Sequence, residues 1–225
     1  MQNMQEVLEG IENSAAKSGR KAGEVQLVAV SKTVEPARIL QAVEAGATML
    51  GENRVQEWKE KQEILPENIS WHIIGRLQKN KVKYIIGKID LLHSLCTLDV
   101  AQEIERLSAK AGVRTSCLVQ VNIANEQSKA GVEAGELFGF LEQMQGFSHL
   151  RVQGLMAIAP FVENPEDVRK YFAQMRELYE KMPVGGNLER KFLSMGMSGD
   201  YKVAIEEGSN MVRVGSSIFG ARDYQ

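Results

Sequence analysis

This chain of 225 residues has only two cysteines and five prolines, and no apolar run reaches the roughly 18 residues that a membrane-spanning helix needs. Its 27 basic and 29 acidic residues nearly balance, so the net charge of −2 gives no global basic field to attract nucleic acid or an anionic membrane. The opening residues lack the basic and apolar regions of a signal peptide. Cys96 and Cys117 are not in CxxC spacing, which indicates buried free thiols. These absences predict a cytoplasmic protein that binds neither nucleic acid nor a membrane.

Familiar catalytic fingerprints are missing as well. The chain has no Gly-x-Ser-x-Gly elbow, no P-loop and no dinucleotide-binding motif. His93 and His149 have no neighbours at metal-ligand spacing, so we expect no metal site. Any chemistry must therefore come from residues outside these motifs.

Short apolar runs alternate with amphipathic segments along the chain. The strand-like runs are at 26–30, 48–51, 70–74, 91–94, 116–121, 151–156, 192–194 and 210–214. The helix-like segments, with apolar residues at three- and four-residue spacing, are at 2–18, 35–44, 54–64, 79–86, 100–111, 134–145, 165–181 and 200–207. Eight strands that alternate with helices and lack hairpin signals imply a parallel sheet. The length favours closure into a single-domain (β/α)8 TIM barrel over residues 1–225, with an extra N-terminal helix, and an open doubly wound sheet is the alternative.

Lys32 follows the first apolar run, in the sequence LVAVSKT at 27–33. In a barrel of this kind the active site lies at the C-terminal ends of the strands. Desolvation there disfavours the ammonium form of a lysine and leaves the free amine that forms imines with aldehydes. The alternative is that the strand ends where solvent begins and that Lys32 is the first exposed residue.

Two loops rich in glycine and serine follow the last two strand-like runs. Their sequences are SMGMSGD at 194–200 and RVGSSIFG at 213–220. Glycines let the backbone approach an anion, serine hydroxyls can donate to it, and a following helix offers free N–H groups. Because barrels commonly hold phosphate between the loops after strands 7 and 8, the pair predicts a phosphate site.

Three further residues have more than one interpretation. Arg213 shares a strand face with Gly215, but alternation does not say whether that face lines the barrel interior. If Arg213 points inward, its partner is either a carboxylate (Glu52 or Asp200) or a heteroaromatic nitrogen of a cofactor.

His72 lies among apolar neighbours, where a hydrogen-bonded core histidine is more common than a functional one. Met156 is core by default, with packing on a ligand ring as the alternative. A local basic patch is either a solvated helix face or a second anion or partner site, and it consists of Lys79, Lys81, Lys83 and Lys88.

Seven motifs spread nearly end to end support a more specific interpretation. They are AVSKT at 29–33, GENRVQE at 51–57, HIIGRLQKNK at 72–81, VN at 121–122, GLM at 154–156, SMGMSGD at 194–200 and RVGSSIFG at 213–220. Together they resemble the motifs of the pyridoxal 5′-phosphate (PLP) homeostasis proteins, which look like the barrel domain of alanine racemases and so like fold-type III PLP proteins.

The resemblance implies a cofactor and a role for each matching residue. PLP would form an aldimine (Schiff base) with Lys32, with its phosphate on Ser198, Gly215 and Ser216. Arg213 would lie at the pyridine nitrogen, and Asn53 and His72 around the ring. The family pattern often has threonine where Ser216 stands, and both residues keep the hydroxyl.

Two functions of different classes remain. A PLP-dependent racemase-like enzyme needs a second base opposite Lys32, and in the racemases a tyrosine from a C-terminal domain supplies it. This sequence ends at Gln225, soon after the eighth strand-like run. An arginine, whose pKa exceeds about 12, does not protonate the ring nitrogen, so the ring is a weaker electron sink, as it also is in the racemases. We therefore expect a monomeric protein of vitamin B6 and amino-acid homeostasis that holds PLP without turnover. Its implied partners are PLP-dependent apo-enzymes or regulatory proteins.

Overall fold

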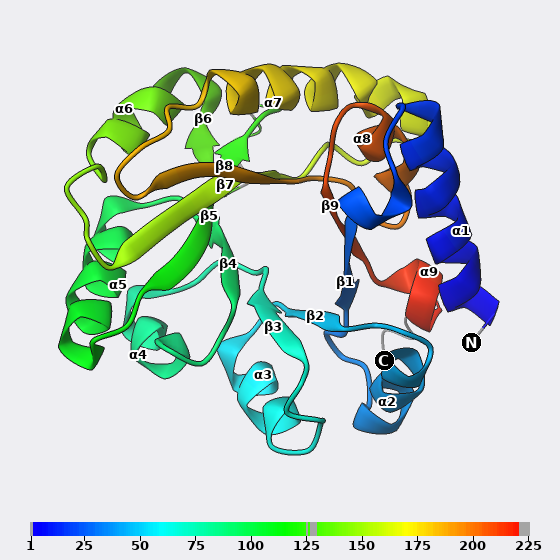
Figure 1. The fold of residues 1–225 in the computed structure, drawn as a ribbon, viewed down its shortest axis with the longest axis horizontal. Helices are drawn as coiled ribbons and strands as arrows, with labels where there is room; N and C mark the ends of the chain where they lie inside the picture. The colour runs from blue at the N-terminus through cyan, green and yellow to red at the C-terminus, as the bar shows by residue number, and fades with distance from the viewer. Residues whose placement is uncertain (1, 125, 127–129, 221–225) are drawn as a thin grey trace.

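Eight parallel strands close into a barrel in the computed structural model, which describes residues 2–124, 126 and 130–220 (Figure 1). The hydrogen-bonded order is β4-β3-β2-β1-β9-β8-β7-β5, and β5 pairs back with β4. The barrel strands are β1 (Gln26–Val30), β2 (Met49–Glu52), β3 (Ser70–Ile73), β4 (Leu91–Leu95), β5 (Thr115–Asn122), β7 (Leu150–Ala157), β8 (Leu188–Ser194) and β9 (Met211–Val214). The predicted (β/α)8 barrel is confirmed, and the open sheet is excluded by the β4–β5 pairing.

The strand predictions are close to the observed bounds. The largest difference is in β8, which begins at Leu188 and not at residue 192. One strand was not predicted, the two-residue β6 (Val132–Glu133), which pairs with the end of β5 outside the ring. Two residues are too few to show the alternation by which strands are recognised in a sequence.

The helices lie outside the ring of strands (Figure 1). They are α1 (Gln2–Lys17), α2 (Pro36–Glu44), α3 (Val55–Gln62), α4 (Val82–Ile85), α5 (Leu98–Ala111), α6 (Leu137–Glu142), α7 (Arg169–Lys181), α8 (Tyr201–Glu206) and α9 (Ser216–Phe219). The extra helix α1 packs on α8 and α9. Helices predicted at 79–86, 134–145 and 165–181 each begin with a 3-10 turn: η2 (Lys79–Lys81), η3 (Ala134–Glu136) and η4 (Pro165–Val168). A further turn, η1 (Ala22–Glu24), and helix α9 were not predicted.

Local sequence explains several helix ends. Proline at position 36 occupies the first turn of α2, where its missing N–H costs nothing. Helix α5 ends at Ala111 and is capped by Gly112, which takes the left-handed conformation with φ of 66° that glycine adopts without a steric penalty. No helix in the described part of the chain is both long and apolar enough to cross a bilayer.

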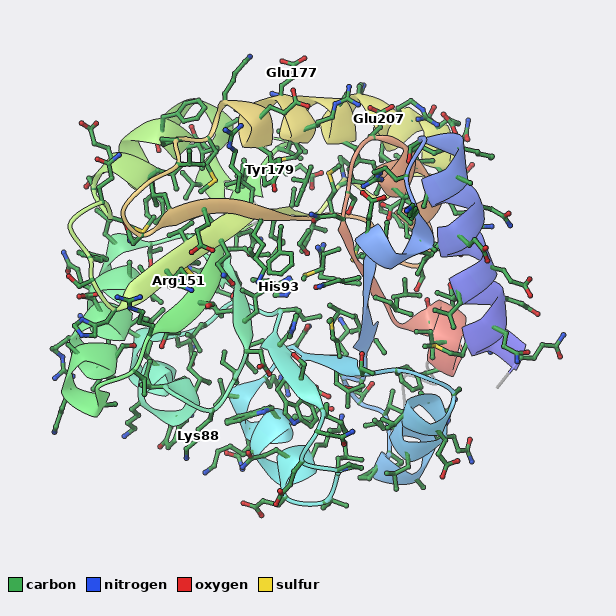
Figure 2. All side chains as sticks on the ribbon, in the orientation of Figure 1. Lys88, His93, Arg151, Glu177, Tyr179 and Glu207 are labelled. Carbon is green, nitrogen blue, oxygen red and sulfur yellow. The ribbon has the colours of Figure 1, made fainter. Side chains whose placement is uncertain are left out.

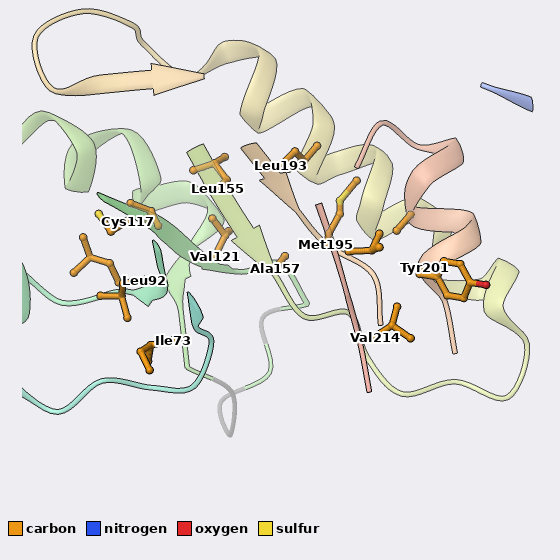
Figure 3. Close-up of a cluster of buried hydrophobic side chains, with 14 of the residues drawn as sticks. Ile73, Leu92, Cys117, Val121, Leu155, Ala157, Leu193, Met195, Tyr201 and Val214 are labelled. Carbon is orange, nitrogen blue, oxygen red and sulfur yellow. The ribbon is translucent and has the colours of Figure 1, made fainter. Parts of the chain in front are cut away.

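Apolar side chains form two layers of core. The larger layer fills the space between the strands and the helices, and Figure 3 shows part of it, including Ile73, Leu155 and Val214. A smaller cluster consists of Val28, Leu91, Leu118, Met156 and Met211. Along each strand, successive side chains point to opposite faces, so these residues lie on the other face of the strands from the larger layer. Val28 is the register partner of Arg213, so the face of β9 that bears Arg213 belongs with this smaller, interior cluster.

Candidate functional site

One cavity of about 560 Å³ lies at the C-terminal ends of the barrel strands. Six of the eight predicted site residues line it: Lys32, Asn53, Ser198, Arg213, Gly215 and Ser216. They come from the ends of β1, β2, β8 and β9 and from the segments that follow them. Arg76, Gln120 and Asn122 add polar groups to the same lining. The cavity therefore joins a lysine, an arginine and two hydroxyl-bearing loops in one space.

The other two predicted residues, His72 and Met156, do not line this cavity. His72 is buried in β3 with its ring beside His93, and Met156 is buried in the interior cluster. Their side chains belong to the layer of the barrel interior that supports the site.

Arg213 points into the barrel and is almost fully buried. Its Nη1 donates to Ser194 Oγ at 2.7 Å, and its Nη2 donates to the Ala157 carbonyl at 2.9 Å. Neither carboxylate considered from the sequence is the partner in these bonds. They use two of the five guanidinium N–H groups, so the others can serve a ligand in the cavity. Burial lowers the pKa of Arg213 to about 10, so the side chain is still a cation at neutral pH.

A row of hydrogen-bonded side chains continues from Arg213 into the barrel. His93 Nδ1 lies 3.1 Å from Ser194 Oγ, His93 Nε2 lies 2.9 Å from His72 Nδ1, and His72 Nε2 lies 3.3 Å from Ser70 Oγ. Figure 2 shows His93 inside the ring of strands, whereas Glu177 and Lys88 lie at the periphery. Burial lowers the pKa of both histidines, and that of His72 to about 4. Both rings are thus neutral, and they hold Ser194 against Arg213 without adding charge to the interior.

Acidification is expected to destabilise the fold through His72. Because the pKa of His72 is about 4 when folded and about 6.5 when unfolded, the unfolded chain binds the proton first as the pH falls. The stability from the neutral ring is complete above pH 6.5 and is lost as the pH falls towards 4. Between pH 7 and pH 5 the loss is about 2 kcal/mol.

Urea unfolding of the wild type and of His72→Gln at both pH values measures this effect. The variant should lose about 2 kcal/mol less than the wild type between the two. Equal losses in both proteins would contradict a buried, neutral His72.

The two predicted phosphate loops are tied together by Ser198. Its Oγ accepts the N–H groups of Gly215 and Ser217 at 3.2 and 3.3 Å, and Ser217 Oγ lies 3.5 Å from the Ser198 carbonyl. A side chain at Gly199 would meet no atom within 4 Å, so the approach to this loop is open. Serine hydroxyls and glycine backbone thus meet at the cavity wall, a set of groups that fits a phosphate.

The cavity wall also includes a buried polar atom that a ligand can satisfy. Asn122 lines the cavity, and its Oδ1 is buried without a hydrogen-bond partner among the described residues. On the same wall Gly75 lies so close to Asn53 that an added Cβ would be 2.3 Å from its carbonyl oxygen. The backbones of Gly75 and Asn53 pack closely and shape the cavity wall, and this packing requires that residue 75 has no side chain.

Lys32 is half-buried in the turn after β1. The Val34 N–H donates to the Ser31 carbonyl at 3.0 Å and closes this turn, and Thr33 has a positive φ of 61°. A second lysine, the buried Lys61 of α3, lies behind this turn and was not predicted as part of the site. It lies in a charged stretch of sequence that is typical of a solvated helix face. Its position four residues after Glu57 was the available signal, because such spacing joins the two on one helix face.

A second cavity of about 620 Å³ adjoins the first and shares Asn53 and Arg76 with it. Part of the predicted basic patch lines it, since Lys79 and Lys81 lie there with Arg54. Lys83 instead lies over the ring of Tyr84, 5.1 Å from its centroid. In the described residues no three acidic, histidine or cysteine side chains come together as a metal site would need.

Comparison with known proteins assigns this barrel to a class. The family model for the N-terminal domain of alanine racemase matches residues 8–223. An alanine racemase from Clostridium difficile shares the fold, with a TM-score of 0.68 at 16% identity over 100% of this chain and 58% of that one. The molecule is therefore a barrel of the alanine racemase type.

Closer relatives identify the family within that class. The pyridoxal phosphate homeostasis protein of Aquifex aeolicus is 42% identical over 99% of this chain and 98% of its own length, and that of Escherichia coli is 35% identical over 99% and 96%. PipY of Synechococcus elongatus, solved with PLP bound, is 33% identical with a TM-score of 0.78 over 93% of this chain and 100% of that one. The crystal structure of an unknown protein from Bifidobacterium adolescentis is 32% identical, with a TM-score of 0.89 over 96% of this chain and 93% of that one. The chain belongs to the pyridoxal phosphate homeostasis protein family.

Proposed function

We propose that this protein binds PLP as an aldimine with Lys32 and takes part in PLP homeostasis without turning over a substrate. The observation that carries the proposal is the single cavity shared by Lys32, Arg213 and the loop of Ser198. Such a cavity offers an amine for the aldehyde, a guanidinium for the ring nitrogen and hydroxyl groups for the phosphate. The PLP-bound PipY structure and the names of the relatives support the same ligand.

In this proposal the Lys32 amine adds to the aldehyde of PLP and water leaves, so that the imine forms and hydrolyses reversibly. Ser198, Gly215 and Ser216 hold the phosphate, and Arg213 donates a hydrogen bond to the pyridine nitrogen. Asn53 lies beside the ring. His72 and Met156 support the ring from the layer below, His72 through the hydrogen-bonded row that ends at Arg213.

The second candidate function is that of a racemase-like enzyme, because alanine racemase shares the barrel fold. The absence of turnover distinguishes the proposed function from this candidate. The PLP-loaded protein is expected to exchange no α-proton of the common amino acids in deuterated water above the level of unloaded protein. Proton NMR of each amino acid measures the exchange, and the near-ultraviolet or visible band of the protein verifies loading. Exchange that disappears in Lys32→Ala would replace this proposal with the racemase-like enzyme.

We further infer that the cofactor passes to PLP-dependent apo-enzymes or regulatory proteins in the cytoplasm. The half-buried Cys96 and the buried Cys117 are both free, as suits a reducing compartment. A reversible imine suits delivery, because hydrolysis releases PLP unchanged. A monomer fits this role, since each barrel has its own cavity.

A further inference from the structure

Three charged side chains, two of them buried and one partly exposed, form a cluster directly behind the turn that bears Lys32. Lys61 Nζ lies 2.9 Å from Glu52 Oε1 and 2.7 Å from Glu57 Oε1. The Lys61 side chain is 7% exposed and that of Glu52 is fully buried. Burial raises the pKa of Glu52, and the hydrogen bonds from Ser31 and Lys61 oppose that rise. A buried set of charges is weak evidence for stability, so its position calls for a functional explanation.

The cluster binds the chain on both sides of Lys32. On one side, Lys61 Nζ donates to the Ser31 carbonyl at 2.6 Å. The Ser31 hydroxyl in turn donates to Glu52 Oε1 at 2.6 Å. On the other side, the Thr33 N–H donates to Glu57 Oε1. The backbone immediately before and after Lys32 is thereby attached to one group of side chains.

Thr33 needs such an attachment because its backbone is strained. Its φ of 61° is the one positive value among the non-glycine residues that the structure describes. A β-branched residue rarely adopts this conformation, and it persists only where the surroundings enforce it. The hydrogen bond from the Thr33 N–H to Glu57, with Glu57 itself held by Lys61, is a contact that can enforce it.

Lys61 itself is unsuited to react with an aldehyde. Its ammonium has three N–H groups, and three oxygens accept from it: the Ser31 carbonyl and the carboxylates of Glu52 and Glu57. An ammonium held in this way has no lone pair to offer. The two lysines near the end of β1 therefore have different tasks, Lys32 in the cavity and Lys61 behind it.

We propose that Lys61 and Glu57 are positioning residues that hold the strained turn at Thr33 and so aim the Lys32 side chain into the cavity. The proposal rests on the proposed function of Lys32 as the residue that forms the imine. It explains why Lys61, whose ammonium makes three hydrogen bonds, is buried near Lys32, the lysine that must react. Loss of the contact should let Thr33 return to negative φ and turn Lys32 away, without removing any group that touches the ligand.

Glu57→Ala tests this most cleanly, because alanine suits the first turn of α3 and Glu57 is partly exposed. Its matched control is Glu60→Ala, which removes the same charge from the exposed side of the same helix. On mixing with PLP, the imine band of Glu57→Ala should appear roughly ten- to a hundredfold more slowly than that of the wild type or of Glu60→Ala, since a small misplacement of a reacting group has effects of this size.

Thr33→Asn separates positioning from general damage, because asparagine tolerates positive φ. Added to Glu57→Ala, it should restore most of the lost rate, whereas a merely structural or electrostatic role of Glu57 would leave the rate low. Equal rates in Glu57→Ala and Glu60→Ala, or no rescue by Thr33→Asn, would overturn the proposal.

A crystal structure of Glu57→Ala tests the same turn without any cofactor. Thr33 should be found at negative φ, and an unchanged turn would overturn the positioning role even if PLP bound normally. Failure of the proposed function has a different signature, because the wild type itself would then give no imine band.

Discussion

Lys32→Ala is expected to abolish the near-ultraviolet or visible absorbance band that PLP gives with the wild-type protein. The band requires an imine, and the lysine that lines the cavity from the end of β1 is the group proposed to form it. The phosphate loops and Arg213 stay in place in the variant, so it should still bind PLP without a covalent bond. The spectrum of that complex should be that of an unmodified aldehyde. Absorbance titration of both proteins with PLP measures the difference.

Reduction with borohydride identifies the lysine directly. In the wild type, one reduced phosphopyridoxyl group should map to Lys32 by peptide mass analysis, and Lys32→Ala should carry none there. Lys110→Ala, which removes an exposed lysine from the last turn of α5, is the control and should behave as the wild type. A band that survives in Lys32→Ala, or a label found on Lys61 or Lys79, would contradict the assignment.

The fold could be predicted from the sequence because its strands, apart from the first part of β8, are largely buried on both faces. Such strands read as short apolar runs, and helices with their own periodicity separate them. What the pattern does not record is closure, because the first barrel strand, β1, pairs with the last, β9, and joins residues as far apart in the sequence as Gln26 and Met211. The 3-10 turns at Lys79, Ala134 and Pro165 also escape it, because one turn has no period of its own.

The site was predicted only in part, for a reason that Arg213 illustrates. The alternation of side chains along a strand predicts that Arg213 and Met211 share a face. Only the folded structure shows that this face lines the barrel interior. His93 was set aside for lack of metal-ligand spacing, although it links His72 to Ser194. Such contacts join residues up to about a hundred positions apart and have no local pattern in the sequence.

Arg213, in β9, also depends on a feature of β7, the strand on the far side of β8. Its Nη2 donates to the carbonyl of Ala157, the last residue of β7. The pairing of β7 with β8 shifts register between Val152 and Gly154, and Gly154 has a positive φ of 137°. A shift of this kind redirects all the residues that follow it. Gly154 thus sets how the end of β7 meets the site.

Gly154→Ala is therefore expected to damage both the fold and the cofactor site. A Cβ at this position would lie 1.9 Å from the Phe192 carbonyl oxygen of β8, and the backbone conformation is one that alanine rarely adopts. Strain and overpacking together should destabilise the protein by about 3 to 5 kcal/mol, which corresponds to a melting temperature lower by roughly 10 °C for a chain of this size. Differential scanning calorimetry measures the shift.

Gly139→Ala is the matched control, because Gly139 lies in α6 and a Cβ there would meet no atom within 4 Å. In a helix the same substitution should be neutral or stabilise by about 0.5 to 1 kcal/mol. If Gly154→Ala and Gly139→Ala had the same melting temperature, the close approach of β7 to β8 would not be a constraint on the barrel. If Gly154→Ala is folded at temperatures below its lowered melting temperature, its absorbance band with PLP should also be weaker there than that of Gly139→Ala. The reason is that the Ala157 carbonyl holds one end of the Arg213 guanidinium, so a displaced β7 moves the group that faces the cofactor ring.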